Sequence, residues 1–276
     1  MIKFIKKILL FIIRKINKIN YKKKFIFIHI PRSGGTSIKK FIFLNFGKEK
    51  VLENNDMNLI DYRYLNKNDK YNFFVGHKQI INTENTNNVN YFTVLRNPVD
   101  RVVSYYFYLK NFEKIKGEKK QLDNFVIDQN MNFDQYIEYT EEKFWDNLIV
   151  RFFSGKIIPL INPGRMKNFI GQYDVNDLKI DEKDFTLAKN NLKKVKIFFT
   201  KNTNKKNLSE YFSTKISLPF KIYNYSKIDY EIKDYQIKKI KDLNQLDFKI
   251  FDYFNNWLNL FNRLIFFPKY IDPSIV

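Results

Sequence analysis

A strand that runs directly into a glycine-containing turn and then into a helix is the feature that most constrains how this chain folds. The apolar run Phe25–Ile30 is rich in β-branched and aromatic residues, which is typical of a buried strand. The turn at Pro31–Gly35 is followed by Thr36–Leu44, whose apolar spacing predicts a helix. A buried strand joined to a helix by so short a turn indicates an α/β architecture.

The residues of this turn have the chemistry of an anion-binding site at a helix N-terminus. Gly34 and Gly35 allow the backbone to come close to a ligand and to direct amide N–H groups at it. Thr36 and Ser37 add hydroxyl donors, and Arg32 adds a fixed positive charge with a planar set of donors. We therefore expect this turn to hold a phosphate or sulfate group.

The turn does not match the two best-known nucleotide-binding loops. A Walker A loop, G-x-x-x-x-G-K-[ST], needs glycine where this chain has Ile30, and the dinucleotide pattern G-x-G-x-x-G is not present here. For this stretch taken alone, an ordinary Gly-Gly turn before a helix stays open as the alternative.

A second predicted strand, Tyr91–Arg96, ends in an arginine just before another helix. Pro98 can open that helix at its first turn, and Ser104 follows Arg96 by roughly two turns. In open α/β sheets, ligands bind at the carboxyl ends of strands, so Arg96 and Ser104 are expected to converge on a further phosphate. The alternatives are a solvated or salt-bridged arginine at positions 96 and 101, and plain helix surface at Ser104.

Strands alternate with helices along the rest of the chain. Further strands are predicted at Phe73–Gly76 and Val195–Thr200, and further helices at Phe133–Tyr139, Phe144–Phe153, Thr186–Leu192, Asn207–Phe212 and Ile237–Leu260. Lys110–Asp128 is predicted to be an exposed loop and Lys156–Asn176 an irregular surface segment. The pattern predicts a P-loop-like single α/β domain over residues 25–276, with a central, mainly parallel sheet flanked by helices.

Residues 1–24 are predicted to form a separate, basic amphipathic helix. Its apolar face carries Ile2, Ile5, Ile8, Leu9, Ile12, Ile13, Ile16 and Ile19, and its other side carries Lys3, Lys6, Lys7, Arg14 and Lys18. The uninterrupted apolar run is too short to span a bilayer, and there is no small-residue cleavage site typical of a signal peptide. Two interpretations stay open: a helix lying on an anionic membrane surface, and a helix packed on the domain's own core.

Charge and composition restrict the chemistry that the chain can perform. With 49 Lys and Arg against 29 Asp and Glu, the net charge is +20, which attracts nucleotides, anionic glycans, nucleic acid or anionic membranes without selecting one of them. The abundance of Lys, Asn, Ile, Phe and Tyr is also what an A/T-rich genome produces. Because the chain has no cysteine and only two histidines, disulfides and thiolate metal sites are excluded and a multi-histidine metal site is not expected.

With both loops in view, the chain resembles the sulfotransferases that use 3′-phosphoadenosine-5′-phosphosulfate (PAPS), and most closely the carbohydrate branch that includes heparan sulfate 2-O-sulfotransferase. His-Ile-Pro-Arg-Ser-Gly-Gly-Thr-Ser at 29–37 resembles the family's 5′-phosphosulfate loop, and Leu-Arg-Asn-Pro-Val-Asp-Arg-Val-Val-Ser-Tyr-Tyr at 95–106 resembles its 3′-phosphate motif. Weaker similarity at Val75–Lys78, Asp146–Gly155, Ala188–Tyr211 and Leu246–Tyr253 extends the resemblance over about Phe25–Trp257.

The resemblance implies a role for each matching residue. The loop from Arg32 and Ser33 to Ser37 would bind the 5′-phosphosulfate, Arg96 and Ser104 would bind the 3′-phosphate, and His77 would be the base that takes the acceptor proton. The family usually has Lys where this chain has Arg32, so Arg32 would act by charge and hydrogen bonding rather than as a proton donor. This chemistry needs no metal ion. His29 is expected to be a core or loop-bracing residue, because it lies inside the predicted strand before the loop.

The family branch also implies the acceptor, a carbohydrate hydroxyl, and the positive charge favours an anionic glycan such as a uronic-acid polymer. Asn147 and Arg151, four residues apart on one predicted helix face, are candidates to line the acceptor cleft; a capped or paired surface is the alternative. We expect a cytoplasmic protein whose N-terminal helix is available to the inner face of the membrane.

Two other function classes fit parts of the sequence. A nucleotide-dependent kinase also needs phosphate loops, but it usually has a Walker loop or Mg²⁺-binding carboxylates, and Asp100 is the only acid within the second motif. A nucleic-acid-binding protein would account for the charge and the many aromatic residues. Because those aromatic residues lie mostly in apolar runs, which are typical of core, we do not expect nucleic acid as a partner.

Overall fold

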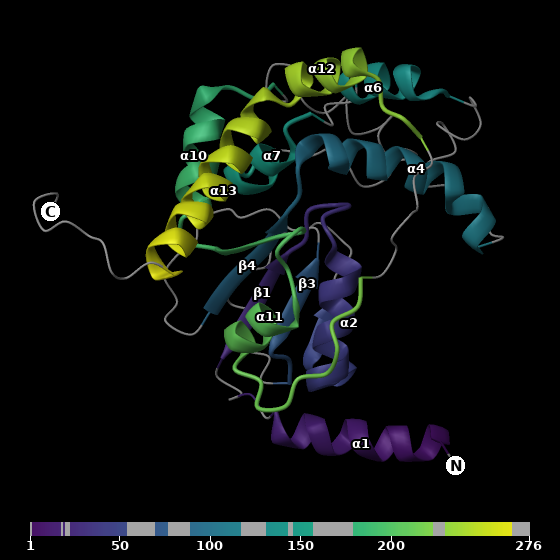
Figure 1. Cartoon of the computed structure of the whole chain (residues 1–276), viewed down its shortest axis with the longest axis vertical. Helices are drawn as coiled ribbons and strands as arrows, with labels where there is room; N and C mark the ends of the chain where they lie inside the picture. Colours follow the sequence, from purple (N-terminus) through teal and green to yellow (C-terminus); the bar gives the residue numbers. More distant parts are fainter. Residues whose placement is uncertain are drawn as a thin grey trace, which may run out of the picture.

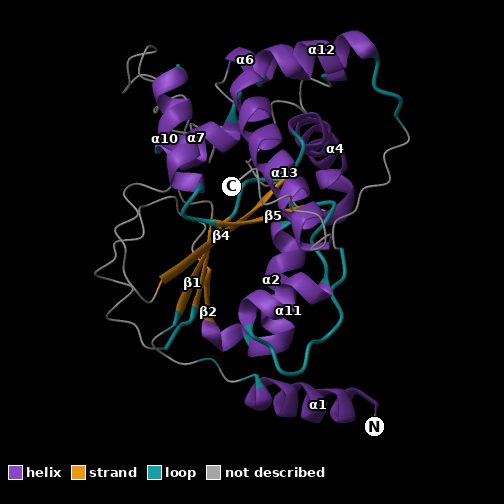
Figure 2. Ribbon diagram, turned by 60° about the vertical axis from the view of Figure 1, so that its left-hand side comes forward, coloured by secondary structure: helices purple, strands orange, loops and turns teal. Residues whose placement is uncertain are grey.

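The computed structural model of the protein describes residues 2–17, 19, 23–53, 70–76, 89–116, 131–142, 146–156, 179–222 and 230–266. Within these ranges, five strands form one sheet in the order β2-β3-β1-β4-β5, and every pair of neighbours is parallel (Figures 1 and 2). The strands are β1 (Lys24–Ile28), β2 (Val51–Glu53), β3 (Phe73–Gly76), β4 (Val89–Leu95) and β5 (Lys196–Phe199). The predicted α/β fold with a mainly parallel sheet is confirmed.

Helices cover both faces of this sheet (Figure 1). The helices of the described residues are α1 (Ile2–Ile16), α2 (Gly35–Phe46), α4 (Pro98–Lys116), α6 (Phe133–Glu142), α7 (Leu148–Ser154), α10 (Glu182–Leu192), α11 (Lys205–Phe212), α12 (Asp234–Leu243) and α13 (Gln245–Phe266), with a short 3₁₀ turn at Lys48–Lys50. None of the helices in the described part of the chain is long and apolar enough to cross a bilayer.

The strands are apolar on both sides because each face of the sheet packs against helices. Phe25 and Phe27 of β1 point into the cluster that contains α2 and α11, whereas Ile26 and Ile28 point into the cluster that contains α7, α10 and α13. On the first face, the ring of Phe212 meets the rings of several strand phenylalanines edge to face. A third apolar cluster joins α4, α6 and α12, at the opposite end of the molecule from α1 (Figure 1).

Several expectations about helix boundaries are wrong. The helix expected at Phe144–Phe153 begins at Leu148, and the one expected at Thr186–Leu192 begins at Glu182. The segment Lys110–Asp128, expected to be a loop, is helical at its start, because α4 continues to Lys116. The sequence has no helix-breaking glycine between Pro98 and Gly117. The expected single helix at Ile237–Leu260 is divided at Asn244 into α12 and α13. Residues 117–128 and 157–176 of the predicted irregular segments lie outside the described residues.

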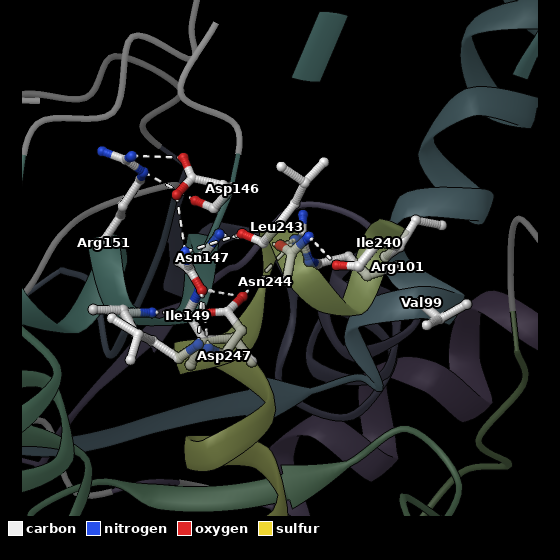
Figure 3. Close-up of polar contacts among 12 residues, drawn as sticks. Val99, Arg101, Asp146, Asn147, Ile149, Arg151, Ile240, Leu243, Asn244 and Asp247 are labelled. Carbon is white, nitrogen blue, oxygen red and sulfur yellow. Dashed lines mark hydrogen bonds and ion pairs between the residues drawn. The ribbon is translucent and has the colours of Figure 1, made fainter. Parts of the chain in front are cut away.

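A buried polar junction between α7 and α13 explains the break at Asn244 (Figure 3). The Asn147 side-chain oxygen accepts from the backbone N–H groups of Leu246 and Asp247, both at 3.1 Å, and so caps α13. In return, the Asp247 carboxylate accepts from the N–H groups of Ile149 at 3.0 Å and Val150 at 2.9 Å, and so caps α7. Each helix start is therefore capped by a side chain that belongs to the other helix.

The same junction holds α4. The buried Arg101 guanidinium of α4 donates to the Asn244 side-chain oxygen at 3.1 Å and lies 3.8 Å from the Asp247 carboxylate. Burial raises the pKa of Asp247 to about 6, although Arg101 and the two backbone N–H groups favour its ionised form. Asn244 cannot continue a straight helix and also make these contacts, so the tertiary structure overrides the local helical pattern.

Replacing Asp247 with Ala is expected to destabilise the protein by roughly 3–5 kcal/mol, because two helix-capping N–H groups and a buried guanidinium lose their partner. Urea unfolding at neutral pH measures this change. Asp252→Ala, an exposed position on the same helix, is the matched control and should change the unfolding free energy by less than about 0.5 kcal/mol. Equal effects of the two substitutions would contradict the capping role of Asp247.

Candidate anion-binding site between two loops

Two loops that leave adjacent strands meet at the carboxyl edge of the sheet. The loop after β1 leads into α2 and then to β2 on one side of the sheet, whereas the loop after β4 leads through α4 toward β5 on the other side. The connections therefore diverge between β1 and β4. In doubly wound sheets, this divergence makes the crevice in which ligands bind.

Hydrogen bonds join the two loops directly. The Arg96 guanidinium donates through Nη1 to the backbone oxygen of Arg32 at 3.0 Å. The Arg32 guanidinium donates to the hydroxyl oxygen of Ser104, from Nε at 3.3 Å and from Nη2 at 3.2 Å. Thr93 of β4 also donates its hydroxyl to the Ile28 backbone oxygen at 2.8 Å, which fixes the strand ends beside the loops. The sequence-predicted residues of the two motifs thus form one cluster.

The first loop has the backbone form of an anion-binding turn. Arg32 and Gly34 both have positive φ, 63° and 85°, a conformation that is costly for a residue with a side chain. Gly34 is the N-cap of α2, and no side chain caps this helix start. Because the first N–H groups of a helix have no acceptor within the helix, this end carries partial positive charge directed at the loop.

Arg32 is held by an aromatic ring as well as by Ser104. The guanidinium carbon lies 4.5 Å from the centre of the Tyr108 ring, one helical turn beyond Ser104 on α4. Burial lowers the pKa of Arg32, and the positive charge of Arg96 lowers it further, while Tyr108 and Tyr105 act in the opposite direction. The groups that act on the pKa of Arg32 among the described residues are therefore two tyrosines and a second arginine.

Ser33 contributes a hydroxyl that nothing in the described protein satisfies. Its side chain is buried, and the Oγ atom has no hydrogen-bond partner. A buried polar atom without a partner is costly, so such atoms in native proteins call for an explanation. A bound oxyanion at the helix start would provide an acceptor for this hydroxyl.

His29 and Gly35 fit together tightly at the base of the loop. The imidazole of His29 stacks on the ring of Phe27, with centroids 5.4 Å apart. A side-chain carbon at Gly35 would overlap the His29 ring, so only glycine lets α2 begin this close to the strand. The prediction that His29 braces the loop agrees with these contacts.

The anion-binding groups form one positively charged, partly buried cluster, which consists of Arg32, Arg96, the start of α2 and the Ser33 hydroxyl. Such a cluster suits an oxyanion such as a phosphate or sulfate ester. Residues 17–254, most of the chain, match the family model described as "Sulfotransferase family". The chain belongs to the sulfotransferase family. No curated protein matches this sulfotransferase significantly.

The predicted site residues of the sulfotransferase fall into three groups. Residues Arg32 to Ser37, Arg96 and Ser104 are brought together at one edge of the sheet, although their ligand stays a prediction. His77 lies outside the described residues. Asn147 and Arg151 are buried in the junction of α7 with α13, where Arg151 pairs with Asp146 at 2.7 Å; a role in the acceptor cleft stays a prediction.

Tyr108 is a contributor that the sequence interpretation missed, whereas Arg101 is the salt-bridged arginine that it gave as an alternative. Tyr108 follows Ser104 by four residues, so both lie on the same face of α4, and this spacing could have indicated the contact with Arg32. The partners of Arg101 could not be predicted, because Asn244 and Asp247 are far away in sequence. Among the described residues, no group of three or more His, Cys, Asp or Glu could hold a metal ion.

Gly35→Ala is expected to destabilise the sulfotransferase by about 1–3 kcal/mol, because the added methyl group overlaps the His29 imidazole. Chemical denaturation of Gly35→Ala, His29→Ala and the double variant measures this coupling. If the clash is with His29, the double variant is more stable than the sum of the single changes predicts, by at least about 0.5 kcal/mol. Simple additivity would show that His29 is not the residue that requires glycine.

Proposed function

We propose that this sulfotransferase transfers the sulfuryl group of PAPS to a hydroxyl of a carbohydrate, with release of adenosine 3′,5′-bisphosphate (3′,5′-ADP). The observation that carries the proposal is the contact between the two loops, in which Arg32 reaches Ser104 and Arg96 reaches the Arg32 backbone. PAPS has two separate phosphate positions, and two adjacent anion-binding loops at one sheet edge match that need. The family membership makes sulfuryl transfer the expected reaction.

In this proposal, each loop binds one end of the donor. The 5′-phosphosulfate lies at the start of α2, where the backbone N–H groups of residues 34–36 and the unsatisfied Ser33 hydroxyl can donate to it; the N–H groups of Ser33 and Ser37 already donate to the backbone oxygens of Ile30 and Gly34. The 3′-phosphate lies against Arg96 and Ser104. Ser104 now accepts from Arg32, so its hydroxyl hydrogen is available to donate to a phosphate oxygen.

The reaction is an in-line displacement at sulfur. The acceptor oxygen forms a bond to sulfur while the bond from sulfur to the bridging phosphate oxygen breaks, and 3′,5′-ADP leaves with that electron pair. The acceptor proton passes to a base, for which the family resemblance proposes His77, whose ordinary pKa suits this role near neutral pH. Charge that grows on the sulfuryl and bridging oxygens is stabilised by the loop N–H groups and by Arg32.

Arg32 acts in this scheme as a fixed charge. Although burial and Arg96 lower its pKa, a guanidinium begins from so high a value that it stays protonated. Ser104 and Tyr108 hold it in place, so little ordering is needed when the donor binds. It therefore stabilises the leaving oxygen without giving up a proton.

The acceptor class rests on the resemblance to the carbohydrate branch and on charge. A net charge of +20 favours an anionic glycan over a neutral one. Nucleic acid is less well supported, because the strand phenylalanines, which would have to be exposed to stack on bases, are packed against one another in the core. The cytoplasmic location stays a prediction from the sequence.

Isothermal titration calorimetry with 3′,5′-ADP tests the donor site. We expect binding at least about tenfold tighter than that of ATP or 5′-AMP, and a loss of at least about tenfold in Arg96→Ala, which removes a charged phosphate contact. Lys193→Ala, an exposed cation on the surface, is the matched control and should bind like the wild type. Equal affinity for the three nucleotides would refute the PAPS proposal and favour a kinase-like enzyme.

Radiolabelled PAPS then tests the acceptor, with heparosan, an unsulfated uronic-acid polymer, as the probe and a neutral glucan as its control. Label transferred to heparosan alone supports an anionic glycan. If the protein binds 3′,5′-ADP selectively but transfers label to neither polymer, the proposed donor site is supported and the proposed acceptor class is rejected.

A further inference from the structure

Helix α1 exposes most of its large apolar side chains. Five of them lie within an arc of about 100° on the helix, and Phe4 and Phe11 lie beside that arc. The five are Ile5, Ile8, Leu9, Ile12 and Ile16, with exposed fractions between 37% and 57%. Phe4 and Phe11 are exposed by 67% and 59%. So large a continuous apolar surface is unusual on a soluble protein and indicates a contact with something else.

The domain holds α1 by a different side of the helix. Ile13 is buried, the Arg14 guanidinium donates to the Phe43 backbone oxygen at 2.9 Å, and the Asn17 amide donates to the Ile216 backbone oxygen at 2.6 Å. The Ile216 backbone N–H returns a hydrogen bond to Asn17 at 3.0 Å. Docking on the domain therefore fixes the orientation of α1 and covers Ile13, but it leaves Ile5, Ile8, Leu9, Ile12 and Ile16 exposed.

The charge around this face identifies the kind of surface that it fits. Residues 1–24 contain nine Lys or Arg and no Asp or Glu. Lys15, whose ammonium lies 4.8 Å from the Phe11 ring centre, stands beside the apolar face, where it could reach lipid headgroups. An apolar helix face accompanied only by positive charge is complementary to a bilayer with anionic headgroups.

We propose that α1 lies flat on an anionic membrane surface and anchors the protein there, with Ile5, Ile8, Leu9, Ile12 and Ile16 in the headgroup–acyl boundary. At 15 residues, the helix is suited to the plane of the interface rather than to crossing it. The partner that covers this face is thus lipid, and the helix's contacts with Phe43 and Ile216 hold the rest of the protein at a set angle.

The proposed orientation also sets where the anion-binding loops face. Helix α2 begins at those loops with Gly35 and ends beside α1, where Asn17 contacts the Asn45 backbone oxygen. Its 12 residues span roughly 18 Å, and Figure 1 shows α1 below the sheet while α4 begins at the sheet's other end. The loops therefore lie on the side of the domain away from the bilayer, open to a water-soluble acceptor.

Vesicle co-sedimentation of the full chain tests this proposal. We expect binding to phosphatidylcholine vesicles that contain about 30% phosphatidylglycerol, weaker binding to pure phosphatidylcholine, and a decrease as salt is added. Ile8→Glu/Ile12→Glu should lower the partition coefficient at least about tenfold, because two charges enter the interface. The matched control is Leu187→Glu/Ile222→Glu, at two positions that are as exposed but lie elsewhere, and it should bind like the wild type.

The thermal unfolding midpoint of each variant checks that the fold is retained, and sedimentation velocity without lipid checks self-association. Failure of the wild type to bind anionic vesicles, or equal binding by the Ile8/Ile12 variant, would overturn the proposal. Self-association that this variant abolishes, without vesicle binding, would assign the face to a second copy of the chain instead. These outcomes do not depend on the nucleotide specificity of the loops.

Discussion

The hydrogen bond from Arg96 to the Arg32 backbone oxygen joins two loops that are more than sixty residues apart in sequence. It is possible only because β1 and β4 are parallel neighbours in register, so that both strands end at the same edge of the sheet. Two guanidiniums are thereby brought together in a partly buried place, and burial already lowers the pKa of one of them. Such a concentration of positive charge is unfavourable without an anion, and this supports the proposal that the two loops bind one.

The second loop is held in place from behind by the polar junction. Helix α4 carries Ser104 and Tyr108 toward Arg32, and it carries Arg101 into the contact with Asn244 and Asp247. Because Asp247 and Asn147 also cap α7 and α13, the position of α4 is linked to that of two helices on one face of the sheet. Buried polar networks of this kind favour one arrangement over alternatives, although the Nε atom of Arg101 has no hydrogen-bond partner within the described residues.

The sequence allowed the sheet, its parallel direction and the two loops to be predicted, because each depends on a local pattern. Phe73–Gly76 is one apolar run with clear ends, and its predicted bounds match β3. The break at Asn244 could not be predicted, because a regular apolar spacing continues through it and its cause lies in Arg101 and Asn147. Strand β2, three residues long, was missed because so short a segment has no detectable period.

The same limit applies to the candidate site. Arg32, Gly34 and Gly35 stand together in the sequence, so their chemistry could be read directly, and Arg96 with Ser104 followed from one strand–helix unit. Asn147 and Arg151 show the opposite case, because their spacing predicted a shared helix face, whereas Asn147 lies before the start of α7 with a left-handed backbone. Both side chains are buried and hydrogen-bonded, Asn147 to the Leu243 backbone oxygen and Arg151 to Asp146.

A crystal structure of the protein with 3′,5′-ADP tests most directly whether the two loops form one site for a doubly phosphorylated nucleotide. We expect the 5′-phosphate at the start of α2, within hydrogen-bond distance of the Ser33 hydroxyl, and the 3′-phosphate on Arg96 and Ser104. A nucleotide bound away from these loops, or one held by only one of them, would contradict it.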